Sequence, residues 1–159
     1  MNNKSIIKIS LIVTSVLLIG LQMVRPKKNV QVVESKNDIE NVVFVPENIK
    51  LILKTACYDC HSNNTEYPWY AEIMPIGNWL NHHVEEGKEH LNFSEFATYS
   101  TKKQDHKLEE TAEEIGEKEM PLGSYTIIHK NAELSDIQIK ELQAWVDAAR
   151  KEIKYQESL

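Results

Sequence analysis

The segment Cys57-Tyr58-Asp59-Cys60-His61 brings two thiols and an imidazole into five consecutive positions. Thiols three positions apart lie on adjacent turns of a helical segment, where they can add to the two vinyl groups of one haem. The histidine directly after the second thiol is then held beneath the ring, where its imidazole can ligate iron. This CxxCH motif predicts one covalent haem c, with Cys57 and Cys60 as attachment residues and His61 as an axial iron ligand.

Three other sites use the same residue types. A thioredoxin-like dithiol needs a βαβ context, and the sequence shows no sign of one. A structural zinc ion needs a fourth ligand, for which His82, His83 and His90 are available. An idle or redox-active CxxC is the third alternative. The histidine that follows the second cysteine favours haem attachment over all three.

The opposite face of the iron takes a second ligand or stays open. Two Met-Pro dipeptides are available, Met74-Pro75 and Met120-Pro121, and a proline restrains the preceding residue to an extended backbone. Met74 follows the motif histidine so closely that most of the intervening chain would be needed to turn around the ring edge. Met120 lies two predicted helices further on, so we expect Met120 to be the sixth ligand. His83 is the alternative ligand, and a partly buried core position is the alternative role for Met120.

The remaining histidines and the aromatic residues carry weaker predictions. His82 and His90 are expected to be solvated, and His106 and His129 to be surface loop residues. Because a porphyrin is large and apolar, aromatic side chains near the motif are candidate packing partners, with ordinary core positions as the alternative. These aromatic residues are Tyr67, Trp69, Tyr70 and Trp79.

The elements that must position these residues are predicted to be helices, so the fold class is all-α, a small cytochrome-c-like helical domain. One helix opens at Pro46 and runs into the motif, and a second covers residues 76–89. A third helix has a solvent-facing side rich in glutamate, and the last helix begins with a capping box at Ser135 and Gln138. Their apolar faces are predicted from Ile49, Ile52, Leu53 and Ala56; Trp79, Leu80, His83 and Val84; Leu108, Ala112 and Ile115; and Ile139, Leu142, Trp145, Val146, Ala149 and Ile153.

Residues 6–24 form an apolar run with a single charge, Lys8, near its start. Nineteen helical residues span about 28 Å, close to the thickness of a bilayer's hydrocarbon core. A cleaved secretory signal is the alternative, but no A-x-A-like site follows the run. We therefore predict an uncleaved signal anchor over residues 1–28. The flanking basic residues are nearly balanced, so the positive-inside rule alone leaves the orientation open.

Charge and composition limit the partners. Without residues 1–28, the chain keeps thirteen basic against twenty-four acidic residues. A domain this acidic is a poor binder of nucleic acid, whose phosphates require cations, and we expect redox proteins with a basic docking face. Residues 29–45 are predicted to be a tether, in which 42–45 could instead pack on the domain or pair as a strand. The haem-binding domain is predicted over residues 46–155.

With these residues laid out, the chain resembles the haem-binding-domain family of short bacterial c-type cytochromes over about residues 46–150. The resemblance implies haem c attachment outside the cytoplasm, and its MP motif falls on Met120-Pro121, which implies Met120 as ligand. Many relatives carry a second proline after MP, where this chain has Leu122-Gly123. The matching stretches are 56–63, 67–70, Trp79-Leu80, 83–87, 90–95, Glu119-Met120-Pro121, Leu134-Ser135 and Trp145.

These observations predict a membrane-anchored, mono-haem cytochrome that carries single electrons and is not an enzyme. A haem-based, peroxidase-like enzyme or a gas or redox sensor, either with a labile sixth ligand, is the alternative. Covalent haem addition takes place outside the cytoplasm, which settles the orientation that charge leaves open. The chain is therefore expected in the bacterial cytoplasmic membrane as a single-pass protein, with its soluble domain in the periplasm or outside the cell.

Overall fold

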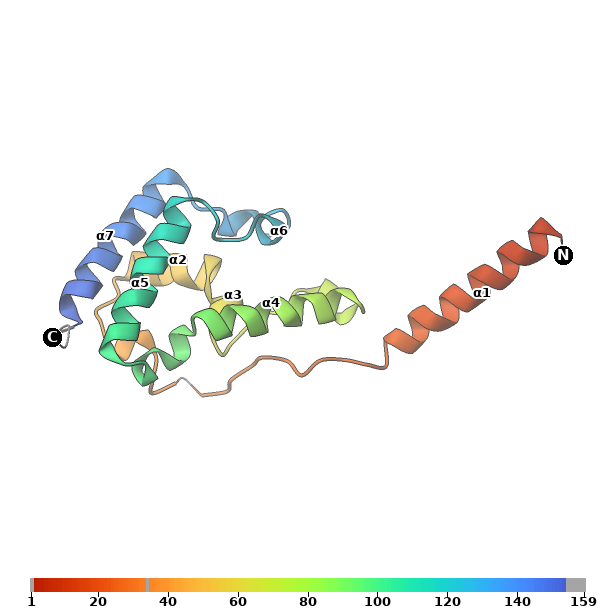
Figure 1. Ribbon diagram of the computed structural model, residues 1–159, viewed down its shortest axis with the longest axis horizontal. Helices are drawn as coiled ribbons and strands as arrows, with labels where there is room; N and C mark the ends of the chain where they lie inside the picture. The colour runs from red at the N-terminus through yellow and green to blue at the C-terminus, as the bar shows by residue number, and fades with distance from the viewer. Residues whose placement is uncertain (1, 34, 154–159) are drawn as a thin grey trace.

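The structure is a computed structural model, and it describes residues 2–33 and 35–153, so that positions 154 and 155 of the predicted domain lie outside the described residues. The described residues form helices and turns without a strand, which confirms the all-α prediction. In chain order (Figure 1) the elements are α1 (Asn3–Leu21), η1 (Ile39–Asn41), α2 (Glu47–Ala56), α3 (Tyr58–His61), η2 (Trp69–Glu72), α4 (Ile76–His90), η3 (Phe93–Thr98), α5 (Thr101–Gly116), α6 (Gly123–Thr126), η4 (Lys130–Ala132) and α7 (Asp136–Glu152).

The helix α1 stands apart from the others, and no part of its apolar stretch is buried (Figure 1). It begins at Asn3, three residues before the predicted span, because the Asn2 side chain accepts a hydrogen bond from the Lys4 amide and caps the helix. Its nineteen residues and mean hydropathy of 1.9 make it long and apolar enough to cross a membrane. A signal sequence passes the same test.

The core of the domain lies where α5 and α7 pack along each other and α2 packs against α7. Leu53, Leu108 and Val146 contribute fully buried side chains from these three helices. Trp145 of α7 is also buried, and its indole N–H donates to the carbonyl oxygen of Phe44 at 3.0 Å. The buried aliphatic side chains therefore fix the helices that lead into and away from the CxxCH motif.

The predicted helix starts follow their capping residues closely. The α7 capping box is confirmed: Gln138 N–H donates to the Ser135 hydroxyl, and the Gln138 side chain accepts from the Ser135 amide. Pro46 is the N-cap of α2 and not part of its first turn, because its ψ of 152° is extended. The helix α4 covers the predicted residues 76–89 and ends one residue later, at His90.

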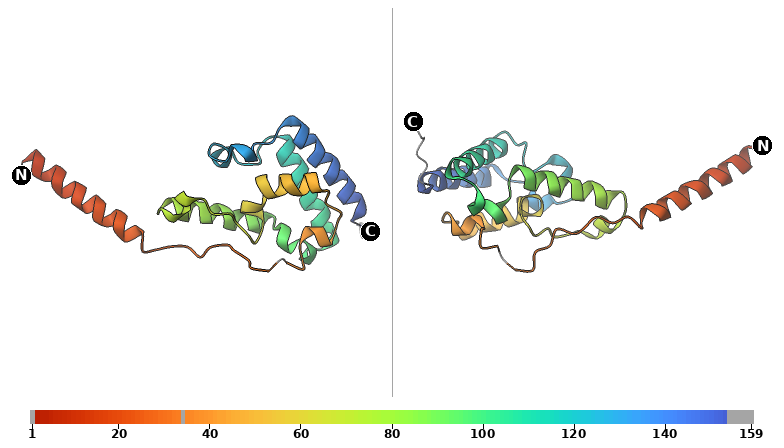
Figure 2. Two further views of the ribbon diagram at one scale, coloured as in Figure 1. Left: turned by 180° about the vertical axis from the view of Figure 1, so that it is seen from behind. Right: turned by 60° about the horizontal axis from the view of Figure 1, so that its bottom comes forward.

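Part of the segment predicted as a tether lies against the domain in the structure. Ile39 is completely buried, and Val43 and Val45 are nearly so. The η1 turn contacts η3, and the Asn37 side-chain amide donates to Glu95 at 2.9 Å. The alternative that residues 42–45 pack on the domain is thus what the structure has. Figure 2 shows the segment running along the domain from two further sides.

Candidate functional site

The CxxCH motif sits at the turn between α2 and α3. The amide of Cys57 closes α2 by donating to the Leu53 carbonyl at 2.9 Å. The amides of Cys60 and His61 then both donate to the Cys57 carbonyl, at 3.2 and 2.9 Å. The two thiols therefore lie one helical turn apart, as the spacing predicts, and both are free.

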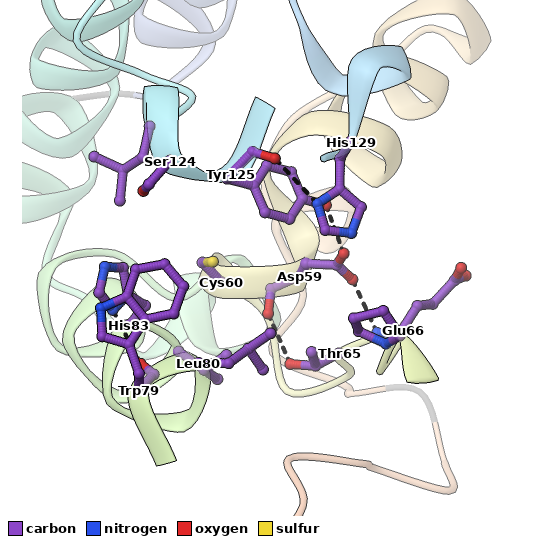
Figure 3. Close-up of a pocket in the computed structure, with 13 residues that line it drawn as sticks. Asp59, Cys60, Thr65, Glu66, Trp79, Leu80, His83, Ser124, Tyr125 and His129 are labelled. Carbon is purple, nitrogen blue, oxygen red and sulfur yellow. Dashed lines mark hydrogen bonds between the residues drawn. The ribbon is translucent and has the colours of Figure 1, made fainter. Parts of the chain in front are cut away.

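The two thiols face different surroundings. Cys57 packs against the hydrophobic core, and burial, with the Cys60 thiol as the second cause, raises its pKa to about 12. Cys60 lines a pocket (Figure 3), and burial together with the neighbouring Asp59 carboxylate raises its pKa to about 11. Both sulfurs are therefore protonated at neutral pH, which suits addition across a carbon–carbon double bond and disfavours the thiolate chemistry of a redox dithiol.

His61 is held in one orientation by a backbone group thirty residues away. Its Nδ1–H donates to the Leu91 carbonyl oxygen at 3.0 Å, and its ring meets the edge of Phe93 at a centroid distance of 6.5 Å. Burial lowers the pKa of His61, so the imidazole is neutral. A hydrogen bond from one ring nitrogen to a carbonyl is the usual way in which proteins orient a metal-binding histidine, and it leaves Nε2 as the nitrogen that can bind iron.

A glycine lets α4 approach the motif. A Cβ atom on Gly87 would lie 2.7 Å from the Cys60 carbonyl oxygen and 3.1 Å from the Cys60 Cβ. Real Cβ atoms essentially never come within 3.0 Å of another heavy atom, so only glycine permits this spacing between α3 and α4. The side chains of α4 can therefore form one wall of the space into which Cys60 points.

The pocket beside Cys60 has a cavity volume of about 40 Å³ and is partly open to solvent. Its walls come from α3, α4, the loop between them and the segment around α6 (Figure 3). The surface that lines it is almost entirely apolar, and its apolar residues are Pro68, Trp79, Leu80, Val84 and Leu122. Such a lining suits a large apolar ring system with a few polar groups at the edge.

Polar side chains close one rim of the pocket. The Tyr125 hydroxyl donates to Asp59 at 2.6 Å, and the Tyr125 ring stacks on His129 with centroids 4.1 Å apart. Tyr70 contacts the same histidine: its hydroxyl lies 3.2 Å from His129 Nε2. His129 lies in a loop, as expected, but it is half-buried and in ring contact with both Tyr70 and Tyr125. The four-residue spacing of Tyr125 and His129 is the sequence pattern that could have paired them.

The structure separates the two candidates for the sixth ligand. His83 lines the pocket together with Cys60, and its Nδ1–H donates to the Trp79 carbonyl at 3.0 Å. Met120 is half-buried and packs against the hydrophobic core, while Leu122, two residues later, reaches the pocket wall. Met74 is buried elsewhere, close to Gly77. The loop of Met120 is thus at the pocket, but the Met120 side chain packs against the core.

The aromatic residues near the motif have different roles. Trp79 lines the pocket, half-exposed, although it was expected on the inner face of its helix. The Tyr67 hydroxyl accepts a hydrogen bond from the Asn29 amide at 2.8 Å. Trp69 is 78% exposed and does not line the pocket. Of these rings, only Trp79 has a place where it could pack on a cofactor bound beside Cys60.

The zinc alternative gains no support from the geometry. Among residues 2–33 and 35–153, no three His, Cys, Asp or Glu side chains come together as a metal-ion site. His82 pairs with Glu86 on the exposed side of α4, and His90 is exposed at the end of that helix. These two candidate fourth ligands are therefore exposed, as their expected solvation requires.

Comparison with known protein families decides the kind of site. A family model described as "Haem-binding domain" matches residues 16–148, most of the chain. The chain belongs to this haem-binding-domain family. The resemblance seen in the motifs is thereby confirmed, and the protein binds haem. No curated protein and no solved structure matches the chain.

The residues present in this haem-binding domain fit the cofactor. Two free thiols flank one helical turn, a neutral imidazole follows them with one nitrogen already satisfied, and the adjoining pocket is apolar apart from its rim. Cys57 and Cys60 would hold the haem by their sulfurs and His61 would ligate its iron. When bound, the haem supplies one-electron chemistry by cycling between ferrous and ferric iron.

Proposed function

We propose that this protein is a membrane-anchored, mono-haem c-type cytochrome that carries single electrons outside the cytoplasm and is not an enzyme. The observation that carries the proposal is the motif turn: two free thiols on adjacent turns, followed by an imidazole whose Nδ1 is tied to Leu91. Each thiol S–H would add across one vinyl group, its sulfur bonding to one carbon and its hydrogen to the other. This addition requires no oxidant.

The chain's own residues would set the properties of the iron. The Leu91 carbonyl orients His61 and increases its basicity, and the apolar side chains of Trp79, Leu80 and Val84 would limit the access of water to a haem held beside Cys60. We propose Met120 as the sixth ligand on the strength of the MP motif, although it packs against the core in this structure and would have to turn toward the pocket. His83 is the rival, supported by its place in the pocket wall beside Cys60.

The rest of the molecule supports a tethered electron carrier. An apolar helix of nineteen residues precedes the domain, and the domain is strongly acidic. We propose that the helix stays in the cytoplasmic membrane, with the domain in the periplasm or outside the cell, and that basic faces of redox proteins dock on it. Docking through charge would increase the association rate at low salt and weaken as salt increases.

Denaturation followed by acid–acetone extraction tests covalent attachment, with a pyridine haemochrome spectrum to count thioether bonds. We expect the wild-type haem to stay with the polypeptide. Cys57→Ala and Cys60→Ala should each show the band of singly attached haem, and His61→Ala should yield little stable holoprotein. The control Met74→Ala should match the wild type, because Met74 is buried away from the pocket. Wild-type haem that extracts freely would refute the c-type assignment.

A further inference from the structure

The residue directly after α1 is bound to the loop that precedes α4. Gln22 holds both backbone groups of Met74: the Met74 amide donates to Gln22 Oε1 at 3.0 Å, and Gln22 Nε2 donates to the Met74 carbonyl at 2.9 Å. The two residues are fifty-two positions apart in sequence. This clamp fixes the loop at the end of the apolar helix.

The next residues of the chain extend the same contact. Arg25 and Lys28 both pair with Glu72, and the Asn29 amide donates to the Tyr67 hydroxyl at 2.8 Å. Figures 1 and 2 show the result: the end of α4 where the chain enters it faces α1, while α7 lies at the opposite end of the domain. Residues 67–76 thus sit beside the point where the chain leaves α1.

Three large apolar side chains of this region point into solvent. Trp69 is 78% exposed, Ile73 42% and Ile76 41%. Polar groups of the same stretch, Glu72 and the backbone of Met74, are occupied by residues 22–28. The contact with the chain after α1 therefore uses the polar groups and leaves the apolar ones uncovered.

We propose that Trp69, Ile73 and Ile76 form a membrane-contact surface that rests in the membrane–water interface. The inference depends on the anchoring part of the proposed function, because it requires α1 to lie in the bilayer. The bilayer is the occupant since the Gln22 clamp ties Met74, the residue directly after Ile73 and two before Ile76, to the residue that directly follows an apolar span. Tryptophan is also the side chain that concentrates at the membrane–water interface.

This surface would set the position of the haem pocket. Pro68 and Trp79, on either side of the surface residues in sequence, line the pocket beside Cys60. Holding residues 69–76 at the interface would keep the pocket at a fixed distance from the membrane. Electron partners would then be membrane proteins whose redox groups lie near the same level.

Quenching by brominated lipid tests the surface. The chain has three tryptophans, Trp69, Trp79 and the buried Trp145. Full-length haem-loaded protein is reconstituted in phosphatidylcholine vesicles, with or without bromine near the headgroup end of the acyl chains. The Trp79→Phe protein should lose roughly a third of its emission on bromination, because Trp69 is at that depth. The ratio of the two lipids removes quenching by haem.

Three variants serve as controls. Trp69→Phe/Trp79→Phe should show no bromine effect, because only the core Trp145 remains. The triple variant Trp69→Phe/Trp79→Phe/Ile137→Trp has a tryptophan at a position that is 71% exposed, on α7 at the far end of the domain. Its emission should also be unaffected by bromine. Gln22→Ala in the Trp79→Phe protein should remove most of the quenching while haem content stays unchanged.

The outcomes separate this inference from the proposed anchor. If the Trp79→Phe protein floats with the vesicles at alkaline pH but shows no bromine effect, the anchor stands and the surface is overturned. A protein covering Trp69 would give that result. Equal quenching of the Ile137→Trp control, or quenching that survives Gln22→Ala, overturns it as well. A chain that fails to float refutes the anchor and the inference together.

Discussion

Single residues of the motif obtain their chemistry from partners far away in the sequence. The Leu91 carbonyl fixes the tautomer and orientation of His61, and Gly87 makes room for Cys60 by lacking a Cβ. Asp59, between the thiols, accepts from Tyr125 and from the Glu66 amide. The residues around the CxxCH turn therefore orient His61 and shape the space beside Cys60.

At this scale, the sequence predicts what lies within the motif and misses what depends on tertiary contact. The proposed attachment residues and the proposed ligand His61 are predicted from spacing within five positions. Tyr125 and His129 reach the pocket through hydrogen bonds to Asp59 and Tyr70, partners about sixty residues away. No local pattern specifies such partners, which is why the polar rim of the pocket was not predicted.

Removal of the sixth ligand is the residue-scale test of the proposed function. Met120→Ala should keep its covalent haem but become partly high-spin, bind small exogenous ligands more readily and lose the weak ferric methionine–iron absorption band. Its reduction potential should fall, because the thioether that favours Fe(II) is gone. Absorption spectra and a redox titration of detergent-solubilised protein measure both effects.

The matched variants for this test are Met74→Ala and His83→Ala. Met74→Ala should leave the spectrum and potential as in the wild type. If Met120→Ala keeps a low-spin spectrum while His83→Ala turns high-spin, the iron is bis-histidine and Met120 is a core residue. A wild type that is already high-spin would favour the alternative of a peroxidase-like enzyme or sensor.

At the scale of elements, local capping fixes the helices, while side-chain burial fixes their arrangement. The start of α7 could be predicted because Ser135 and Gln138 satisfy each other's amides within four residues. The packing of η1 on η3 could not, because it rests on Ile39, one buried side chain in a polar segment. The close approach of α3 and α4 could not be predicted either, because Gly87 permits it but a glycine in the sequence does not indicate it.

A substitution at Gly87 tests whether the approach of α4 to the motif matters. In Gly87→Ala, the new Cβ would meet the Cys60 carbonyl at 2.7 Å, so α4 must shift. We expect a net loss of roughly 1–3 kcal/mol of stability in spite of alanine's better helix propensity, with reduced haem content. Gly123→Ala is the matched control, since nothing lies within 4 Å of its Cβ. Equal haem content and thermal stability in the two variants would contradict this account.

The ion pair between α5 and α7 predicts an acid-sensitive contact. Arg150 donates to both Asp105 oxygens, at 2.7 and 3.0 Å, and this hydrogen bonding lowers the pKa of Asp105. Because the pKa of Asp105 is lower in the folded protein than in the unfolded chain, the pair stabilises the fold fully above the ordinary pKa of an aspartate. This stabilisation is lost as the pH falls through the lower pKa of the folded protein. Wild type should therefore exceed Asp105→Asn by about 1 kcal/mol at neutral pH, and the difference should vanish in acid.

Unfolding by urea, followed at several pH values, measures that difference. Asp136→Asn is the control, because its partner Lys118 is fully exposed and the pair is open to solvent. It should change stability little at any pH. If the difference between wild type and Asp105→Asn stays constant down to low pH, the pair is not what joins α5 to α7.

On the scale of the whole molecule, the chain combines one apolar helix with one acidic haem-binding domain. The family match covers both, from residue 16 in α1 to residue 148 in α7. The sequence predicts the span from hydropathy alone. It does not predict that Gln22 binds the loop before α4, because that contact joins residues fifty-two positions apart. The domain is thus held close to the end of α1, where a flexible tether was expected.

Membrane orientation is the prediction that joins the two parts. Lys4 precedes the apolar run, Lys8 lies near its start, and Arg25, Lys27 and Lys28 follow it, so the charges nearly balance and a small change should shift the topology. A reporter that is active only outside the cytoplasm, fused after residue 30 or at the C-terminus, should be active in the wild type, and high salt should not release the protein.

Lys4→Gln/Lys8→Gln should reduce reporter activity and covalent haem in parallel, because haem is attached only outside the cytoplasm. Lys27→Gln/Lys28→Gln should preserve both. Covalent haem on chains whose reporter stays cytoplasmic would contradict the orientation and, with it, the link between export and haem attachment.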